Sequence, residues 1–137
     1  MDKARQYLAI GRKAGRVAVG EESCSSAVGS GKAKLFLLAA DASPNAQKRA
    51  AGFLYGRRAP LRTLPWGKAE LSALLGKEGC SMLCFTDLPL AARFAASLAE
   101  AEPEWQETAE LLSRREEKAR RRKAAPRKHQ PSGKRRK

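Results

Sequence analysis

The stretch that decides the fold is residues 33–49, AKLFLLAADASPNAQKR. Its first part, Ala33 to Ala40, is almost continuously apolar, which is typical of a strand covered on both faces in the centre of a sheet. Ser43 is a suitable N-cap and Pro44 a suitable first residue for a helix that we expect to run to about Arg57. A buried strand that leads directly into a capped helix indicates an α/β domain.

Later in the chain the same alternation repeats. Residues 61–64 and 81–85 are expected to form short strands. A helix that ends at Gly76 separates them, and either Thr86 or Asp87 can cap the helix that follows the second strand. The apolar residues of that last helix recur at i, i+3, i+4 and i+7, which is the spacing of one buried helical face.

The segment before residue 33 supplies two further helices and one more short strand. Gly15 ends the first helix, and residues 16–19 form a strand that ends at Gly20. Residues 21–30 suit a second helix, which begins with two acids and stops before Gly31. Helices that alternate with strands in this way predict an α/β fold, here a three-layer α-β-α sandwich with a small mixed sheet.

The chain is strongly basic, with 28 Lys and Arg against 14 Asp and Glu and a formal net charge of +14 over 137 residues. Such a balance favours a polyanionic partner, with nucleic acid first and an anionic membrane surface second. The surplus is concentrated in residues 114–137, which contain 13 basic and 2 acidic residues. The length suffices for one domain with a proper core and an appendage.

We divide the chain into a domain over residues 1–100, a charged, basic helical extension over 101–125 and a disordered basic tail over 126–137. In the extension acids come first and bases last, which complements a helix dipole, and Glu110 and Arg114 have the i, i+4 spacing of a helical ion pair. The tail contains runs of Arg and Lys without an aromatic residue, so it would attract phosphate without reading sequence. A nuclear-targeting signal would have a similar composition.

We expect no catalytic residues and no enzyme. The single histidine, His129, lies in the tail, so the folded part holds no Ser-His-Asp or Cys-His set. Residues 29–32 resemble a phosphate loop in composition but precede a strand, which is the wrong context. Cys24, Cys80 and Cys84 have a poor spacing for zinc and indicate reduced thiols in the core, with no metal and no cofactor.

The sequence shows no targeting or membrane segment. No apolar run approaches the ~18 residues that a membrane span needs, and no secretory apolar region stands at the start. We therefore expect a cytoplasmic protein that has no membrane partner.

Three segments together resemble a known family. They are residues 14–22 (AGRVAVGEE), 30–49 (SGKAKLFLLAADASPNAQKR) and 71–87 (LSALLGKEGCSMLCFTD). In order and spacing they are similar to the ribosomal L-seven-Ae kink-turn RNA-binding family, and within it to the small bacterial YlxQ-like branch. The resemblance covers roughly residues 3–98, and its most specific part is the Asp-Ala-Ser-Pro stretch after the apolar strand. It implies an α-β-α sandwich that binds RNA folded into a kink-turn or a related bend.

The resemblance also implies where the RNA would bind. The start of the second helix would read tandem sheared G·A pairs, the loop before the last strand would cover an extruded nucleotide, and the start of the third helix would line the site. A glycine at a helix start lets backbone approach RNA closely, and a side-chain acceptor there can bond a guanine edge. The residues assigned to RNA binding are Lys13, Arg16, Gly20, Glu21, Glu22, Ser23, Ser26, Lys32, Asp41, Ser43, Pro44, Lys48, Lys77, Glu78, Gly79 and Cys80.

This sequence departs from the family at three of those positions. Counted from Gly20, Glu22 stands in the place of an Asn, Ser23 in the place of a Glu, and Ser26 in the place of a Lys. The missing lysine removes one phosphate contact and lowers the expected salt slope by about one unit. The alternative is therefore a protein-interaction module or ribosome-associated factor that kept the fold and lost the specific readout. A weaker alternative is the substrate-recognition subunit of an RNA-modifying enzyme.

Several of these residues also have an ordinary structural explanation. Exposed lysines and arginines commonly do no more than solvate a surface. Glu21 and Glu22 could be first-turn acids, each worth ~0.5 kcal/mol to the helix. Ser43 and Pro44 would cap a helix in any protein, and Trp66 is more typical of a turn or core anchor than of a base-stacking platform. We expect a monomer whose partner is structured RNA, ribosomal RNA above all, with the ribosome or ribosomal proteins as further partners.

Overall fold

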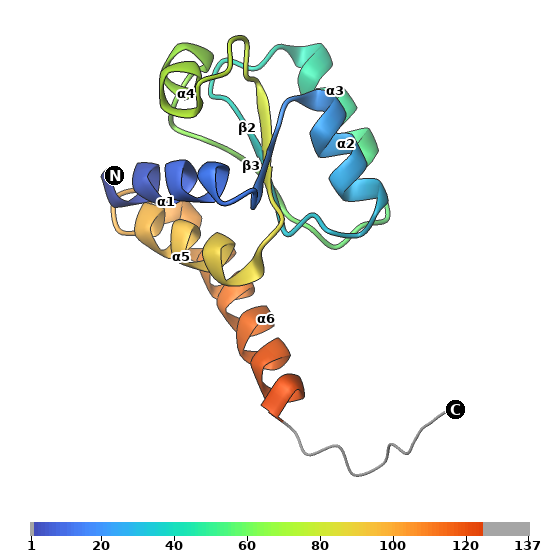
Figure 1. The fold of residues 1–137 in the computed structure, drawn as a ribbon, viewed down its shortest axis with the longest axis vertical. Coiled ribbons are helices and arrows are strands. Elements are labelled where there is room, and N and C mark those ends of the chain that lie inside the picture. Colours follow the sequence, from blue (N-terminus) through green and yellow to red (C-terminus); the bar gives the residue numbers. More distant parts are fainter. Residues whose placement is uncertain (1, 125–137) are drawn as a thin grey trace.

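The computed structural model describes residues 2–124, which form six α-helices, a 3-10 turn and a four-stranded sheet (Figure 1). Helices and strands alternate along the chain, and two helical segments follow the last strand and its helix. The strands are β1 (Val17–Val19), β2 (Leu35–Leu38), β3 (Leu61–Thr63) and β4 (Met82–Phe85). The helical segments are α1 (Asp2–Lys13), α2 (Glu21–Gly29), α3 (Pro44–Phe53), α4 (Lys68–Leu75), α5 (Leu88–Ala99), η1 (Pro103–Trp105) and α6 (Gln106–Ala124).

The sheet is mixed, with the strand order β1-β4-β2-β3. Strand β4 runs antiparallel to both β1 and β2, whereas β3 runs parallel to β2. Cys84 of β4 is the register partner of Ala18 on one side and of Phe36 on the other. Every residue of β2 and β4 is buried, so the expectation of a central apolar strand within residues 33–40 is confirmed.

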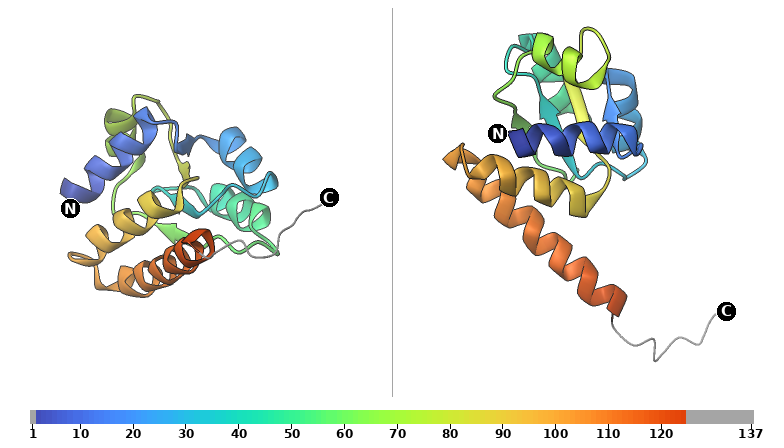
Figure 2. Two further views of the ribbon diagram at one scale, coloured as in Figure 1. Left: turned by 60° about the horizontal axis from the view of Figure 1, so that its bottom comes forward. Right: turned by 60° about the vertical axis from the view of Figure 1, so that its left-hand side comes forward.

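Two layers of helices cover the sheet, so the three-layer expectation is confirmed (Figures 1 and 2). Successive side chains of a strand point to opposite faces. Leu35 and Leu37 accordingly pack with α1, α4, α5 and the start of α6. Phe36 and Leu38 pack with α2 and α3 on the other face. The unbroken apolar run of β2 is thus needed, because both of its faces lie in a core.

The two helix caps expected from the sequence are present. The Ser43 hydroxyl accepts a hydrogen bond from the Ala46 N–H at 3.1 Å, with Pro44 in the first turn. The Asp87 carboxylate accepts one from the Leu90 N–H at 3.1 Å. The expected end of α3 was wrong: the helix stops at Phe53 instead of about Arg57. The chain turns there, and Gly56 adopts a φ of 73°, which a helix cannot continue through.

The C-terminal extension both docks and projects. Its first part packs on α5, where Trp105, Ala109 and Leu112 belong to the main core. Its second part leaves the body of the protein as a single helix (Figures 1 and 2). The expected pairing of Glu110 with Arg114 is replaced by a hydrogen bond from Gln106 Nε2 to Glu110 Oε2 at 3.2 Å. The tail expected over residues 126–137 lies outside the described residues.

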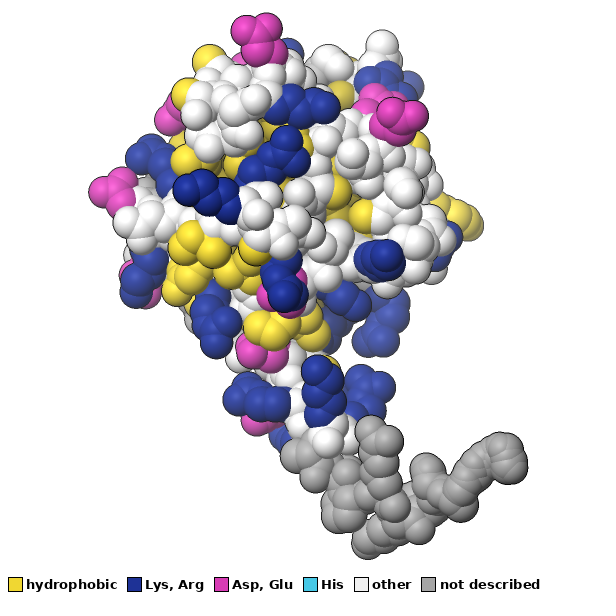
Figure 3. Space-filling model, viewed as in Figure 1, with side chains coloured by type: hydrophobic (Ala, Val, Ile, Leu, Met, Phe, Trp, Pro, Cys, Tyr) yellow, Lys and Arg dark blue, Asp and Glu magenta, His cyan; other side chains and the backbone are white. Residues whose placement is uncertain are grey.

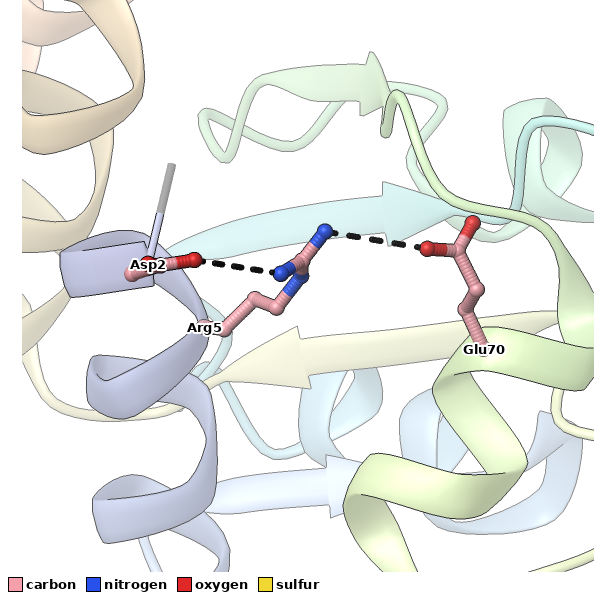
Figure 4. Close-up of polar contacts among 3 residues, drawn as sticks. All are labelled: Asp2, Arg5 and Glu70. Carbon is pink, nitrogen blue, oxygen red and sulfur yellow. Dashed lines mark hydrogen bonds and ion pairs between the residues drawn. The ribbon is translucent and has the colours of Figure 1, made fainter.

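Arg5 ties α1 to α4 (Figure 4). It also covers a buried indole. Its guanidinium lies 3.2 Å from an Asp2 carboxylate oxygen and 3.7 Å from one of Glu70. It also lies 5.5 Å from the centroid of the Trp66 ring, which is buried against Phe94. The expectation that Trp66 is a core anchor is confirmed. No helix between residues 2 and 124 is both long enough and apolar enough to cross a lipid bilayer.

Candidate functional site

Three chain junctions meet at one end of the sheet. Strands β1 and β2 both run antiparallel to β4, so their last residues lie beside the first residues of β4. This brings together the start of α2, the start of α3 and the loop between α4 and β4 (Figure 1, upper part). We call this surface the Gly20 edge and define it by residues 20–23, 41–44 and 77–80. The junctions assigned to RNA binding from the sequence are therefore adjacent in space.

Gly20 has a backbone angle that favours glycine. Its φ of 96° is one that residues with a Cβ rarely adopt, and its N–H donates to the Met82 carbonyl at 2.9 Å. A Cβ built there would also lie 3.3 Å from both Cε and Nζ of Lys77. The Lys77 ammonium group thus lies directly over the start of α2, which has no side-chain cap. Backbone N–H groups and a cation converge at this point.

The exposed acids of α2 differ in their pairing. Glu21 Oε2 lies 2.8 Å from Arg49 Nε, and this ion pair links α2 to α3. Glu22 is exposed and has no Lys or Arg nitrogen within 4.0 Å among residues 2–124. Ser23 and Ser26 are also exposed. Glu22 is thus the acid of this helix start that remains available to accept hydrogen bonds.

Asp41 has a structural partner that the sequence did not indicate. Its Oδ1 accepts a hydrogen bond from the Lys68 N–H at 2.9 Å. The residue before Lys68 is Gly67, which occupies the N-cap position of α4 without a side chain to cap it. A Cβ built on Gly67 would lie 3.2 Å from the Asp41 carboxylate. Asp41 therefore supplies the cap of α4 from the end of β2, 27 residues earlier in the chain.

The loop between α4 and β4 exposes some of its residues and buries another. Lys77, Glu78 and Gly79 are exposed, whereas Cys80 is buried and its Sγ contacts the Met82 carbonyl at 3.7 Å. Burial raises the pKa of the Cys80 thiol, although Lys77 and Arg12 oppose the effect. Cys80 therefore presents almost no surface at the Gly20 edge.

Lys13, Arg16 and Lys32 do not join the other predicted site residues. They precede β1 and β2, so they lie at the end of the sheet where these strands begin, opposite to the Gly20 edge. A strand advances ~3.3 Å per residue, so the length of β2 alone separates the two ends by about 10 Å. Arg16 instead pairs with Asp87, Nη1 to Oδ1 at 2.9 Å, beside the start of α5. The structure thus places these three assigned residues away from the Gly20 edge.

The Gly20 edge and its surroundings carry balanced charge. The acids Glu21, Glu22, Asp41 and Glu78 are matched by the cations Lys48, Arg49, Lys68 and Lys77. Lysine and arginine side chains instead gather around the lower part of the molecule and along α6 (Figure 3). The edge is thus suited to directional hydrogen bonding more than to long-range attraction of a polyanion.

The three cysteines are buried and unlinked, as expected for core thiols. Burial raises the pKa of all three thiols, that of Cys84 to about 11. Among residues 2–124 no three His, Cys, Asp or Glu side chains are grouped so that they could hold a metal ion.

Comparison with known proteins gives structural similarity alone. No protein-family model matches the chain, and no curated protein matches it. A solved structure described as a protein with unknown function from Bacillus halodurans C is similar, with a TM-score of 0.62 and 22% sequence identity. The similarity covers 69% of this chain and 94% of that one. At this identity the likeness shows a shared fold alone.

Proposed function

We propose that this chain is a non-enzymatic RNA-binding protein that recognises a kink-turn or a similar bend in structured RNA, ribosomal RNA above all, through the Gly20 edge. It acts in the cytoplasm as a monomer. The observation that carries the proposal is the convergence of Lys77 with the uncapped start of α2 at Gly20, next to the start of α3. The sequence resemblance to the L-seven-Ae family supports the same surface.

Each group at this edge has a suitable task in RNA recognition. The first N–H groups of α2 point out of the helix end and can donate to a phosphate, and Lys77 adds a charge beside them. The Glu22 carboxylate can accept from the N–H donors of a guanine edge, which phosphate contacts do not distinguish. A bent or unpaired RNA exposes such edges, whereas regular A-form helix presents a major groove that side chains cannot read.

A second candidate function is a docking surface for another protein, such as a ribosomal protein. The balanced charge of the Gly20 edge favours it, because sites dominated by phosphate contacts are usually basic. The two functions differ in what Lys77 and Glu22 would contact. In the second, neither side chain would affect the choice between RNAs.

The test uses the full chain and two RNAs of equal length, one a kink-turn and the other a regular duplex, at two salt concentrations. We expect tighter binding to the kink-turn at both concentrations. Lys77→Gln should weaken that binding several-fold and lower the salt slope by about one unit, and Glu22→Ala should reduce the preference for the kink about tenfold. Neither variant should change the affinity for the regular duplex in the same way.

Matched controls remove the same charges elsewhere. Lys3→Gln on α1 and Glu100→Ala after α5 change exposed residues away from the Gly20 edge and should leave the preference unchanged. If the full chain bound both RNAs with equal affinity and a steep salt dependence, its RNA binding would come from positive charge alone, without recognition of the kink-turn. Absence of RNA binding at physiological salt would favour the protein-docking function.

A further inference from the structure

A second surface lies at the other end of the sheet, where the turn after α3 and the loop before β2 face α6. The three segments enclose an open groove of about 560 Å³. Small apolar side chains form part of its wall: Val28, Ala33, Ala59, Leu88 and Ala119. The polar side chains that line the groove are all cationic: Lys34, Arg57, Arg58, Arg115, Lys118 and Arg122. Among residues 2–124, none of the groove-lining side chains is acidic.

These cations are not neutralised by the described part of the protein. Within residues 2–124, no carboxylate oxygen lies within 4.0 Å of the charged nitrogens of any of the six. Residues 125–137 contain no Asp or Glu, so no side chain of the chain's own tail can supply the missing charge. Like charges held together without counter-charges repel, and an anion placed among them removes that repulsion.

The groove is held together across the chain by a hydrogen bond from a side chain to the backbone. Arg115 Nη1 donates to the Arg58 carbonyl oxygen at 3.0 Å, which fixes α6 to the turn after α3. Burial and the charge of Arg58 lower the pKa of Arg115, so the two guanidinium groups lie close enough to disfavour each other. A guanidinium that is already positioned binds phosphate with less loss of side-chain freedom.

One side of α6 changes character where the helix leaves the domain. Its early residues Ala109 and Leu112 are buried against α5. At the same helical spacing, i+3 and i+4, the next residues are Arg115, Lys118, Ala119 and Arg122, which line the groove. Arg114, Arg120 and Arg121 lie on another side of the same helix and do not line it. The cations of α6 therefore fall on two sides of the helix, with Lys118 between them.

An exposed aromatic ring stands two residues before Arg57 in the chain, just outside the residues that line the groove. Tyr55 is 89% exposed, in contrast to the other large aromatic side chains that the core buries. Exposed aromatic rings beside cations are typical of surfaces that stack unpaired bases and hold the phosphates between them. An acidic peptide would gain little from such a ring. These features favour RNA over an acidic protein segment.

We infer that the groove between α6 and the turn after α3 binds an unpaired RNA segment, with its phosphates along Arg58, Lys118 and Arg122 and a base on Tyr55. The inference rests on the proposed function, since it assumes that RNA is the partner. It adds a second contact at the end of the sheet opposite to the Gly20 edge. A single RNA that runs from a bend into an unpaired strand could then meet both surfaces.

The test uses the full chain and a 12-nucleotide unpaired RNA, with affinity measured at several salt concentrations. The groove variant Arg58→Gln/Lys118→Gln/Arg122→Gln is compared with the control variant Arg114→Gln/Arg120→Gln/Arg121→Gln. Both remove three positive charges from exposed positions, so their effect on overall charge is the same. We expect the groove variant to lose at least tenfold in affinity and about two units of salt slope, and the control to lose under threefold.

Tyr55 provides a second, independent measurement. Tyr55→Ala should lower affinity for the unpaired RNA about fivefold or more, whereas Tyr55→Phe, which keeps a stacking ring, should retain it. Binding of a regular duplex should not distinguish the two Tyr55 variants. Equal losses in the groove and control variants would overturn the inference, as would tighter groove-dependent binding of a 12-residue glutamate peptide than of the RNA, which would assign the groove to an acidic protein.

Failure of this inference and failure of the proposed function give different results. The unpaired RNA contains no bend, so the groove comparison does not depend on recognition at the Gly20 edge. If the chain showed no preference for a kink-turn but only the groove variant lost affinity for the unpaired RNA, the result would contradict only the proposed function. If the chain preferred the kink-turn but the groove and control variants lost the same affinity for the unpaired RNA, the result would contradict only the groove inference.

Discussion

The Asp41 carboxylate accepts a hydrogen bond from the backbone N–H of Lys68 at 2.9 Å and so caps α4 from the end of β2. The contact explains an acid that neither the strand nor the cap of α3 requires. Asp41 lies just before α3, and α3 and α4 pack on opposite faces of the sheet, so the contact also links the two helix layers. Asp41→Ala should therefore destabilise the protein by ~1 kcal/mol, as the loss of a helix cap does, with Asp41→Asn retaining most of the stability.

Denaturant unfolding of the two Asp41 variants checks this prediction. Ser43→Ala, which removes the cap of α3, serves as a reference of similar size. If Asp41→Ala unfolded at the same denaturant concentration as the unaltered chain, the hydrogen bond to Lys68 would have no role in stability.

Gly20 and Gly29 stand before and at the end of the same helix and should respond differently to alanine. Gly20→Ala places a Cβ at a φ of 96° and against Lys77, so we expect a loss of ~1–2 kcal/mol and weaker binding of kink-turn RNA. Gly29 is helical with open space around its Cα, so Gly29→Ala should be neutral or stabilising by up to ~1 kcal/mol. Thermal unfolding and RNA titration of both variants would separate them. A neutral Gly20→Ala would show that neither the backbone angle nor Lys77 constrains the position.

Leu112 anchors α6 in the folded core, so its truncation should destabilise the protein. It is fully buried against α5, whereas its neighbour Leu111 is only half-buried. Leu112→Ala should cost ~2–5 kcal/mol, and Leu111→Ala less than half of that. Denaturant midpoints give both values. For the same reason a chain that ends at residue 100 should be markedly less stable, since it lacks Trp105, Ala109 and Leu112.

The buried thiol of Cys84 should make stability depend on alkaline pH. Burial raises its pKa from 9.0 to about 11. Below pH 9 the thiol is protonated in the folded and unfolded chains alike, so its contribution to stability is fully present. As pH rises from 9 towards 11 the unfolded chain loses the proton first, and the free energy of unfolding falls by ~1.4 kcal/mol per pH unit.

Unfolding measured between pH 8 and 11 checks this linkage, with Cys84→Ala as the comparison. The variant should lose part of the alkaline slope while Cys24 and Cys80, whose pKa values burial also raises, keep the remainder. An unchanged slope in Cys84→Ala would mean that this thiol does not titrate differently in the two states.

Much of the fold could be predicted because its signals are local. The apolar run of β2, the caps at Ser43 and Asp87 and the buried face of α5 each depend on neighbouring residues, and all are present. The boundary of α3 was missed because Gly56 was not recognised as its stop. The pairing of Glu110 was missed because Gln106 and Arg114 both lie one helical turn from it, and it bonds to Gln106.

The candidate site was predicted only in part, for a different reason. The order of strands decides which junctions share an end of the sheet, and strand order is not a local property. Gly20, Asp41 and Lys77 lie at the same end of the sheet because β4 inserts between β1 and β2, and the same insertion sends Lys13, Arg16 and Lys32 to the opposite end. Arg49 was recognised only as a basic neighbour, since its partner Glu21 lies on another helix.

By itself, the sequence determined an α/β sandwich with capped helices, three buried thiols and a strong basic surplus, since these follow from apolar spacing, turn chemistry and composition. Tertiary structure alone decided how the charge is distributed. It paired Glu21 with Arg49, used Asp41 to cap α4 and set Arg115 against Arg58 across 57 positions of sequence. Electrostatic interactions act through space over a few ångströms, so the balanced Gly20 edge and the cationic groove exist only once the chain has folded.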